Sequence, residues 1–203
     1  MAFHVVKLGG SLERSGDIRS LACRLAGRPG VVIVPGGGRF ADAVRAAQGP
    51  LALSDRACHA MAILAMEQMA HALADCAPAL APCRTLEEIE AAAGASAVLW
   101  FPARLLLAAR EIPEDWDVTS DSLACWLATA LAAPSLTLVK APGTPVDAAA
   151  RGDSAADWSA RGLVDRAFPA FAARFCGIVR LVAADDAPAL DRLFPSPRTA
   201  SAA

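Results

Sequence analysis

Lysine is scarce in this chain of 203 residues: 17 of its 19 basic residues are arginine, and only Lys7 and Lys140 are lysine. Arginine carries its charge on a wide planar fork, whereas a lysine ammonium is a compact charge on a thin stem. A site built around an ammonium therefore cannot simply accept arginine. Each lysine follows a short apolar run, so we expect both at strand ends. The alternative is two surface lysines whose stems cover apolar groups.

Other absences exclude several classes of protein. The net charge is −2 and there is no basic run, so the chain has no electrostatic footprint for nucleic acid. Charged residues interrupt each apolar stretch before the roughly 20 residues that a membrane-spanning helix needs. The chain opens directly on a predicted strand, without a signal peptide, which predicts a cytoplasmic protein. The six cysteines form no Cys-x-x-Cys pair and the three histidines no cluster, which predicts reduced thiols and no metal site.

The pattern of apolar residues predicts a single α/β domain. Apolar residues make up 55% of the chain, many of them Ala and Leu, which favours helices packed around a sheet. Continuous apolar runs predict buried parallel strands, and helical spacing follows them. We expect strands at residues 5–8, 31–34, 97–101, 135–140 and 177–182, helices at 18–25, 40–47, 54–76, 85–93, 120–131, 163–175 and 187–194, and a loop at 145–161. The domain would cover residues 1–194, before a disordered tail at 195–203.

Two glycine-rich segments follow the first two predicted strands. Gly9-Gly10-Ser11 comes directly after the first strand, and Gly36-Gly37-Gly38 follows the second; a helical pattern begins after each. Because the strands of such a unit are parallel, both loops would lie at the same edge of the sheet. The N–H groups of glycine loops and of helix N-termini attract anions. The sequence therefore predicts a crevice that binds polyphosphate.

A carboxylate and the second lysine occur later in the chain. Asp121 lies in the first turn of a predicted helix that Thr119 or Ser120 caps. The helix dipole stabilises a carboxylate there by roughly 0.3–1 kcal/mol, which would explain Asp121 without a role in catalysis. Lys140 ends the strand at 135–140 and leads into a turn that contains Gly143.

Three other nucleotide-binding motifs match these segments poorly or not at all. The P-loop pattern Gly-x-x-x-x-Gly-Lys-Ser/Thr does not occur. Val5-Val6-Lys7 is similar to the strand lysine of protein kinases, but their Asp-Phe-Gly and His-Arg-Asp elements are absent. Gly36-x-Gly38-x-x-Ala41 fits a dinucleotide-binding fingerprint, yet no acidic residue ends a strand about 20 residues further on. That fingerprint is therefore a weaker interpretation.

Four motifs, in this order along the chain, resemble the amino acid kinase superfamily. They are Lys7-x-Gly9-Gly10-Ser11, Pro35-Gly36-Gly37-Gly38, Thr119-Ser120-Asp121-Ser122-Leu123-Ala124 and Leu138-Val139-Lys140. The resemblance implies a three-layer αβα sandwich with a mainly parallel central sheet. It also implies phosphoryl transfer from ATP by positioning and charge stabilisation, with Mg²⁺ carried by the nucleotide. After Lys140 the usual Val-Asp-Gly-Val-Tyr is replaced by Ala141-Pro142-Gly143-Thr144-Pro145, so the contacts to adenine are not assigned.

The resemblance also implies a role for each matching residue. Lys7 would hold the transferring phosphoryl group, Lys140 would lie near the β-phosphate, and Asp121 would orient both lysines. The ATP phosphates would be held by Gly9, Gly10, Ser11, Gly143 and Thr144. The acceptor would be faced by Gly36, Gly37, Gly38, Arg39, Asp55, Arg56, Thr119 and Asp165.

Several features resemble the small kinases that convert aminomethyl-furanmethyl phosphate to its diphosphate in methanofuran biosynthesis. These features are the short length, Asp42-Ala43-Val44-Arg45, Trp116 and Gly162-Leu163-Val164-Asp165. In such an enzyme Arg39 or Arg56 would bind the acceptor phosphate, and Asp165 or Asp55 would bind its ammonium.

Other functions of the same superfamily stay open. Ser54-Asp55-Arg56 and the helix after it resemble the acceptor helix of uridylate kinase, and an amino-acid (carboxylate) kinase is a further alternative. Some relatives of uridylate kinase store or sense ligands without transferring phosphate, although both lysines and Asp121 are retained here. The methionine-rich helix at 54–76 predicts a homodimer or a larger homo-oligomer.

Overall fold

Six parallel strands form one sheet at the centre of the computed structural model, which describes residues 2–146 and 152–194. The strands are β1 (His4–Leu8), β2 (Val31–Pro35), β3 (Ala81–Cys83), β4 (Val98–Trp100), β5 (Ser135–Lys140) and β6 (Ile178–Ala183). Their order is β3-β4-β2-β1-β5-β6, and each neighbouring pair is parallel. The predicted αβα sandwich with a parallel central sheet is therefore confirmed. The predicted tail at 195–203 lies outside the described residues.

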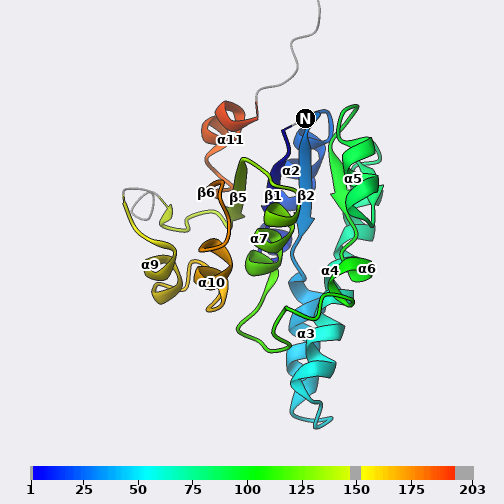
Figure 1. Ribbon diagram of the computed structural model, residues 1–203, viewed down its shortest axis with the longest axis vertical. Helices are drawn as coiled ribbons and strands as arrows, with labels where there is room; N and C mark the ends of the chain where they lie inside the picture. Colours follow the sequence, from blue (N-terminus) through cyan, green and yellow to red (C-terminus); the bar gives the residue numbers. More distant parts are fainter. Residues whose placement is uncertain (1, 147–151, 195–203) are drawn as a thin grey trace, which may run out of the picture.

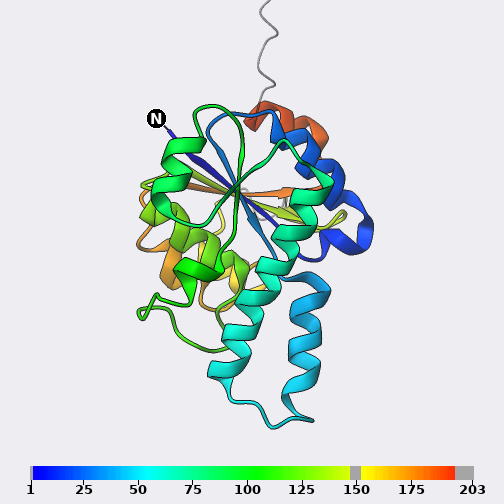
Figure 2. The same cartoon turned by 90° about the vertical axis from the view of Figure 1, so that its right-hand side faces the viewer.

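Helices cover both faces of the sheet. They are α1 (Leu12–Ser15), α2 (Asp17–Ala26), α3 (Gly38–Gln48), α4 (Asp55–Cys76), α5 (Leu86–Ala92), α6 (Ala103–Leu106), α7 (Ser120–Ala130), α9 (Ala155–Ala160), α10 (Phe168–Ala172) and α11 (Ala187–Leu193). Figure 1 and Figure 2 show α2 and α11 on one face and α7 and α10 on the other. The paired helices α3 and α4 extend beyond the carboxyl ends of the strands. Within the described residues, no helix combines the length and apolar character that crossing a membrane requires.

Alternate residues of the central strands supply two apolar cores. Val5, Leu136 and Leu138 are buried with the apolar side chains of α7, whereas Val6 and Leu8 are buried with those of α2. Successive side chains of a strand point to opposite faces, so a strand that is covered on both sides must be apolar throughout. This explains the continuous apolar runs in the sequence.

The segment after β5 differs from the sequence prediction. The loop predicted at 145–161 contains α9, whose N-cap Ser154 and Asp157 form a reciprocal capping box. The helix predicted at 163–175 is shorter in the structure, where only α10 is helical. Pro169 lies in the first turn of α10, a position that favours the start of a helix, and residues 163–167 are not helical. The short elements β3 and α6 were not predicted. Residues 147–151, also within the predicted loop, lie outside the described residues.

Candidate active site

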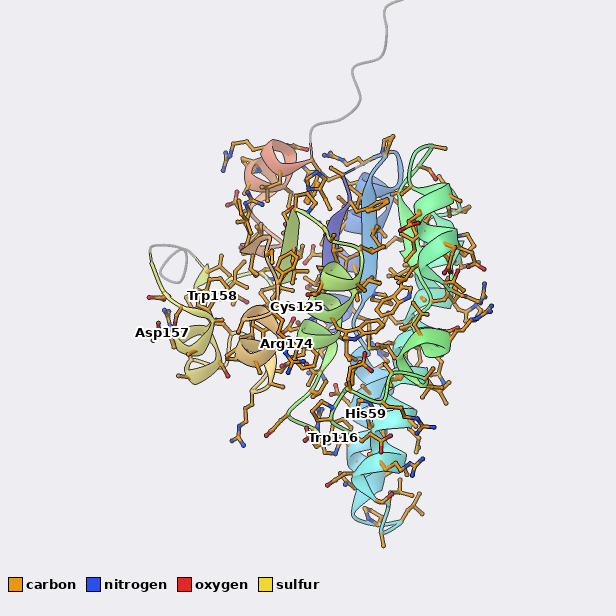
Figure 3. All side chains as sticks on the ribbon, in the orientation of Figure 1. His59, Trp116, Cys125, Asp157, Trp158 and Arg174 are labelled. Carbon is orange, nitrogen blue, oxygen red and sulfur yellow. The ribbon has the colours of Figure 1, made fainter. Side chains whose placement is uncertain are left out.

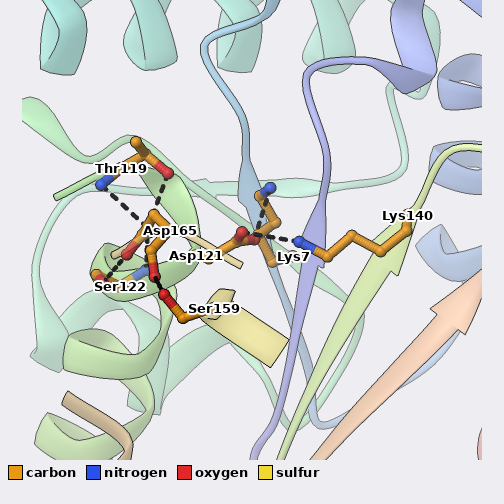
Figure 4. Close-up of polar contacts among 7 residues, drawn as sticks. All are labelled: Lys7, Thr119, Asp121, Ser122, Lys140, Ser159 and Asp165. Atoms are coloured by element: carbon orange, nitrogen blue, oxygen red, sulfur yellow. Dashed lines mark hydrogen bonds and ion pairs between the residues drawn. The ribbon is translucent and has the colours of Figure 1, made fainter. Parts of the chain in front are cut away.

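Strand register places the two lysines on the same face of the sheet. β1 and β5 are neighbours, and Lys7 is paired with Leu138. Lys140 lies two residues beyond Leu138, so its side chain points to the same face as that of Lys7. That face is covered by α7, which carries Asp121 in its first turn. The carboxyl ends of two strands and the start of one helix therefore converge (Figure 4).

Both ammonium groups contact the carboxylate of Asp121. Lys7 Nζ lies 2.8 Å from Oδ1, and Lys140 Nζ lies 2.7 Å from Oδ2. The Lys140 contact is a hydrogen bond, whereas Lys7 approaches as an ion pair. Lys7 and Asp121 are only 5% and 6% exposed. The cluster carries two positive charges and one negative charge, and its remaining positive charge attracts anions.

Burial and charge act in opposite directions on this cluster. Burial alone would raise the pKa of Asp121, but the ammonium groups of Lys7 and Lys140 outweigh it and lower that pKa to about 2. Burial lowers the pKa of Lys140, as does the charge of Lys7, while Asp121 opposes both effects. Asp121 is therefore ionised at neutral pH.

The cluster opens on a cavity of about 380 Å³ that we call the lysine cavity. The connection from β1 to β2 crosses one face of the sheet, whereas that from β5 to β6 crosses the other face, so the chain changes direction between the neighbouring strands β1 and β5. Ligands of open parallel sheets bind at such a switch point. Four of the predicted phosphate-binding residues line the cavity: Gly9, Gly10, Ser11 and Thr144. Gly143 lies beside it, where its N–H donates to Asp185 Oδ2 at 3.3 Å.

A second cavity, of about 330 Å³, lies between α3, α4 and the start of α7; we call it the α4 cavity. Ile63, Met66 and Leu123 supply apolar walls. Its polar lining groups include Arg14, Asp42, Arg45, His59 and Trp116. Figure 3 shows His59 and Trp116 at the end of the molecule where α3 and α4 extend from the sheet. Both cavities are lined by Gly10, Ser11 and Thr119, so they meet there.

The two glycine loops touch through their backbones. A Cβ on Gly10 would lie 2.5 Å from the Cα of Gly38, and a Cβ on Gly36 would lie 3.0 Å from the Cα of Gly10. Real Cβ atoms do not approach other atoms so closely, so the loops need glycine to pack against each other. This requirement is separate from any contact with a ligand.

Only some of the loop amides are available to a ligand. The N–H of Gly9 donates to the carbonyl of Val139 at 3.2 Å, and that of Gly36 donates to the carbonyl of Leu8 at 2.9 Å. The N–H groups of Gly10 and Ser11 have no hydrogen-bond acceptor among the residues that the structure describes. These two amides lie where the cavities meet.

Asp165 binds the start of α7. Its Oδ2 accepts hydrogen bonds from the N–H and the hydroxyl of Thr119 and from the N–H of Ser122; its Oδ1 accepts from the Ser122 hydroxyl. Burial raises the pKa of Asp165, and the nearby charge of Asp121 adds to this, while the hydrogen bonds oppose it. Both carboxylate oxygens are thus engaged by the protein, so the structure gives no support to the predicted contact with an acceptor ammonium.

Three other residues predicted to face the acceptor have partners elsewhere. Arg39 forms an ion pair with Glu13, Asp55 accepts a hydrogen bond of 2.8 Å from the Gln48 amide, and Arg56 lies 3.6 Å from Glu114. Of the residues described, those that line the lysine and α4 cavities include none of these three, nor Gly36. Gly37, Gly38 and Thr119 do line the α4 cavity.

Other polar residues occupy the α4 cavity in their place. Arg14 and Arg45 both pair with Asp42, Arg45 at 3.2 Å. The guanidinium of Arg45 lies 4.4 Å from the ring centroid of Trp116, whose indole N–H donates to Gln48 Oε1 at 2.6 Å. Burial lowers the pKa of His59, against the charges of Glu114 and Asp115, so this imidazole is neutral at pH 7. The sequence prediction assigned no role to Arg14 or His59.

No protein-family model matches the chain, but a curated protein resembles it in sequence. It is the [5-(aminomethyl)furan-3-yl]methyl phosphate kinase of Methanocaldococcus jannaschii, 28% identical over 127 residues. The match covers 61% of this chain and 59% of the relative. The chain therefore matches less than two thirds of the relative's length.

Solved structures resemble the chain over most of its length. The uridylate kinase of Archaeoglobus fulgidus has a TM-score of 0.60 at 18% identity, with 89% of this chain and 90% of that chain covered. UMP kinases from Ureaplasma parvum and Bacillus anthracis have TM-scores of 0.65 and 0.61 at 16% and 13% identity, with 95% and 94% of this chain and 94% and 90% of theirs covered. At these identities the neighbours show the fold. The chain therefore has the fold of these uridylate and UMP kinases, the amino acid kinase fold.

Proposed function

We propose that this protein is an ATP-dependent kinase that phosphorylates a small phosphomonoester. The observation that carries the proposal is the pair of lysine ammonium groups on one buried carboxylate, placed beside the boundary of two cavities. The lysine cavity suits the phosphates of ATP, and the α4 cavity suits the acceptor. Phosphoryl transfer would take place at their boundary, beside Gly10, Ser11 and Thr119.

The residues at this boundary act by position and charge. An acceptor oxygen attacks the terminal phosphorus in line with the leaving oxygen of ADP, and negative charge spreads over the transferring oxygens. Lys7 and Lys140 stabilise that charge, and Asp121 keeps both ammonium groups in place. The open N–H groups of Gly10 and Ser11 add donors at the same point.

A magnesium ion fits this site only as part of the nucleotide. Within residues 2–146 and 152–194, no three His, Cys, Asp or Glu side chains are grouped so as to hold a metal ion. Both oxygens of Asp121 contact ammonium groups. The phosphate oxygens of ATP would therefore bind Mg²⁺, which would supply further positive charge to the transferring group.

The α4 cavity supports an acceptor with a ring, a phosphate and an ammonium group. Ile63, Met66 and the face of Trp116 suit a planar ring, and Arg14 suits an anion. Asp42 is the carboxylate that lines this cavity; it already pairs with Arg14 and Arg45, so an acceptor ammonium would share it with these two guanidinium groups. This combination matches [5-(aminomethyl)furan-3-yl]methyl phosphate, the substrate in the relative's name, which the enzyme would convert to the diphosphate.

UMP is the second candidate acceptor, because it is also a phosphomonoester with a planar ring and the structural neighbours are UMP kinases. An open-chain amino-acid carboxylate would leave the apolar walls of the α4 cavity without a partner. A protein that only stored an anion would not need two ammonium groups oriented by one buried carboxylate.

The kinase proposal is tested by turnover on a panel of acceptors. Purified protein is incubated with Mg-ATP and the aminomethyl-furan phosphate, UMP, aspartate or N-acetylglutamate; ADP release is measured and the product is identified by ³¹P NMR. We expect a diphosphate product from the furan phosphate. Turnover of UMP alone would overturn the acceptor assignment. Binding of ATP without turnover of any acceptor would overturn the kinase assignment in favour of storage.

Substitution of Lys7 tests the carrying observation. Lys7→Ala should lower kcat by roughly 10²–10³-fold, as for other groups that stabilise charge in the transition state. Lys7→Arg keeps the charge but not the compact shape, so we expect it to restore little activity. Arg174→Ala, which removes an exposed charge just after α10, is the control. Near-normal activity of Lys7→Ala would remove Lys7 from the site.

The exposed surface of α4 supports a proposal about the oligomeric state. Met61 and Leu64 are 37% and 45% exposed on this helix. We propose that these side chains are covered in a homodimer, and sedimentation of the protein alongside Leu64→Glu tests it. A wild-type monomer at micromolar concentration would contradict this assembly.

A further inference from the structure

The helix that carries Asp121 depends on a distant residue for its N-terminal cap. α7 begins at Ser120, and in the described part of the chain its N-cap, Thr119, makes no hydrogen bond to the helix through its side chain. The first N–H groups of a helix need acceptors from outside the helix. Asp165 supplies them, with bonds of 3.0 Å from the N–H of Thr119 and 3.0 Å from that of Ser122 (Figure 4).

A local cap was available but is not used. A threonine at the N-cap usually accepts a hydrogen bond from an N–H two or three residues further on. Here the Thr119 hydroxyl donates to Asp165 Oδ2 at 2.8 Å, and the buried Ser122 hydroxyl donates to Oδ1. Asp165 also lies near Asp121, and repulsion between the two negative charges destabilises the ionised form of Asp165. The arrangement therefore joins two segments, which a local cap would not do.

The joined segment is a wall of the lysine cavity. Residues 162–165 line this cavity together with Lys7, Asp121 and Lys140. Two further bonds hold the segment. The Ser159 hydroxyl, in α9, donates to the Asp165 carbonyl at 3.2 Å, and the Ala167 N–H donates at 3.0 Å to the carbonyl of Asp117, which precedes α7. Asp121 lies between Thr119 and Ser122, both of which Asp165 holds.

We propose that Asp165 is a positioning residue for phosphoryl transfer: it fixes the start of α7 against the cavity wall, and thereby fixes where Asp121 holds the two ammonium groups. Asp165 acts through Asp121 and does not touch the reacting atoms. The inference rests on the proposed kinase function. A displacement of about 1 Å in such a constellation lowers a rate by roughly 10²-fold.

The test compares Asp165→Ala, Asp165→Asn and the control Asp117→Asn. Asp165→Ala removes all four bonds, so kcat should fall by roughly 10²-fold while KM for the acceptor changes less than about threefold. In Asp165→Asn the amide oxygen still accepts from backbone N–H groups and its NH₂ donates to the Ser122 hydroxyl, so kcat should recover by about tenfold over Asp165→Ala. Asp117 pairs only weakly, at 3.7 Å, with exposed Arg166, and its substitution should leave kcat unchanged.

Calorimetry with tripolyphosphate separates misplacement from loss of folding. If Asp165 positions the lysines, the Asp165 variants bind tripolyphosphate about tenfold more weakly at an unchanged stoichiometry. If they merely unfold in part, the stoichiometry falls and the affinity of the remainder is unchanged, which would overturn the proposal. If Asp165→Ala fails to fold, the result for Asp165→Asn decides. A kcat and an affinity for tripolyphosphate equal to those of the wild type would overturn the proposal, whereas a lower kcat and a lower affinity would support it.

The same measurements distinguish failure of this inference from failure of the kinase assignment. If the wild-type protein turns over no acceptor, the kinase assignment fails, and the affinity for tripolyphosphate alone decides the role of Asp165. If the wild-type protein is active and Asp165→Ala is equally active, the kinase assignment stands and the positioning role is overturned.

Discussion

Replacing Asp121 with asparagine tests the lysine cluster through stability rather than activity. The side chain keeps its shape but loses its charge, so the ammonium groups of Lys7 and Lys140 face each other without a counter-ion. Their side chains are only 6% and 12% exposed, so water compensates little of the lost interaction. The folded protein should therefore be destabilised.

The magnitude follows from the pKa of Asp121. Folding lowers this pKa from 3.8 to about 2, a shift worth about 2 kcal/mol at 1.36 kcal/mol per unit. Removing one partner of a buried ion pair typically costs about 3–5 kcal/mol. We expect Asp121→Asn to lower the free energy of unfolding by about 2–4 kcal/mol at pH 7. Because the folded-state pKa is depressed, this stabilisation is complete well above pH 3.8 and is lost as the pH falls towards 2.

Urea unfolding followed by tryptophan fluorescence measures the difference between the two proteins. The deficit of Asp121→Asn should be about 2–4 kcal/mol at pH 7 and about 1 kcal/mol smaller at pH 3. Tripolyphosphate should narrow the deficit at pH 7, because it supplies negative charge to the unpaired ammonium groups. Asp117→Asn, at the exposed carboxylate near the start of α7, is the control. Equal stability of Asp121→Asn and wild type at pH 7 would refute the reasoning.

Three further predictions concern the loops and the thiols. Gly10→Ala places a Cβ against the second glycine loop and should lower the free energy of unfolding by about 1–3 kcal/mol, as measured by urea unfolding. Wild-type stability of this variant would show that the loops can separate. Glu13→Gln weakens the link between α1 and α3, and its free energy of unfolding should fall by about 0.5–1 kcal/mol in the same assay; a larger loss would indicate a more rigid junction. Burial raises the pKa of the Cys125 thiol to about 12, so at pH 8 a thiol reagent should label the exposed thiols of Cys23 and Cys176 before that of Cys125. Mass spectrometry of the labelled protein measures the order. Equally fast labelling of Cys125 would contradict its burial.

The fold was predictable because its signals are local. The run Val31-Val32-Ile33-Val34 has the composition that a strand covered on both faces requires, and β2 lies there. The meeting of Lys7 and Lys140 was also accessible, since parallel strands end at the same edge of a sheet. Their catalytic roles stay a prediction.

The rest of the site depends on contacts between distant segments. Nothing near Asp165 in sequence indicates that its carboxylate caps a helix that begins at Ser120. Similarly, the pairing of Arg14 with Asp42 arises only when α1 and α3 pack together. Spacing along the chain also could not show that Gly10 is needed for contact with another loop as well as for a ligand.

The direct contact between the glycine loops separates two properties of the proposed site that could otherwise change together: the distance between the two cavities and the choice of acceptor. Any side chain at the junction would push the two loops apart, and in the proposed kinase this would lengthen the path between the ATP site and the acceptor site. The walls of the α4 cavity come from other segments, among them Ile63 and Trp116, and lie outside the junction. Under the proposed kinase function, descendants of this chain could diverge in substrate choice by exchanging wall residues, while the distance that the phosphoryl group must travel is inherited unchanged.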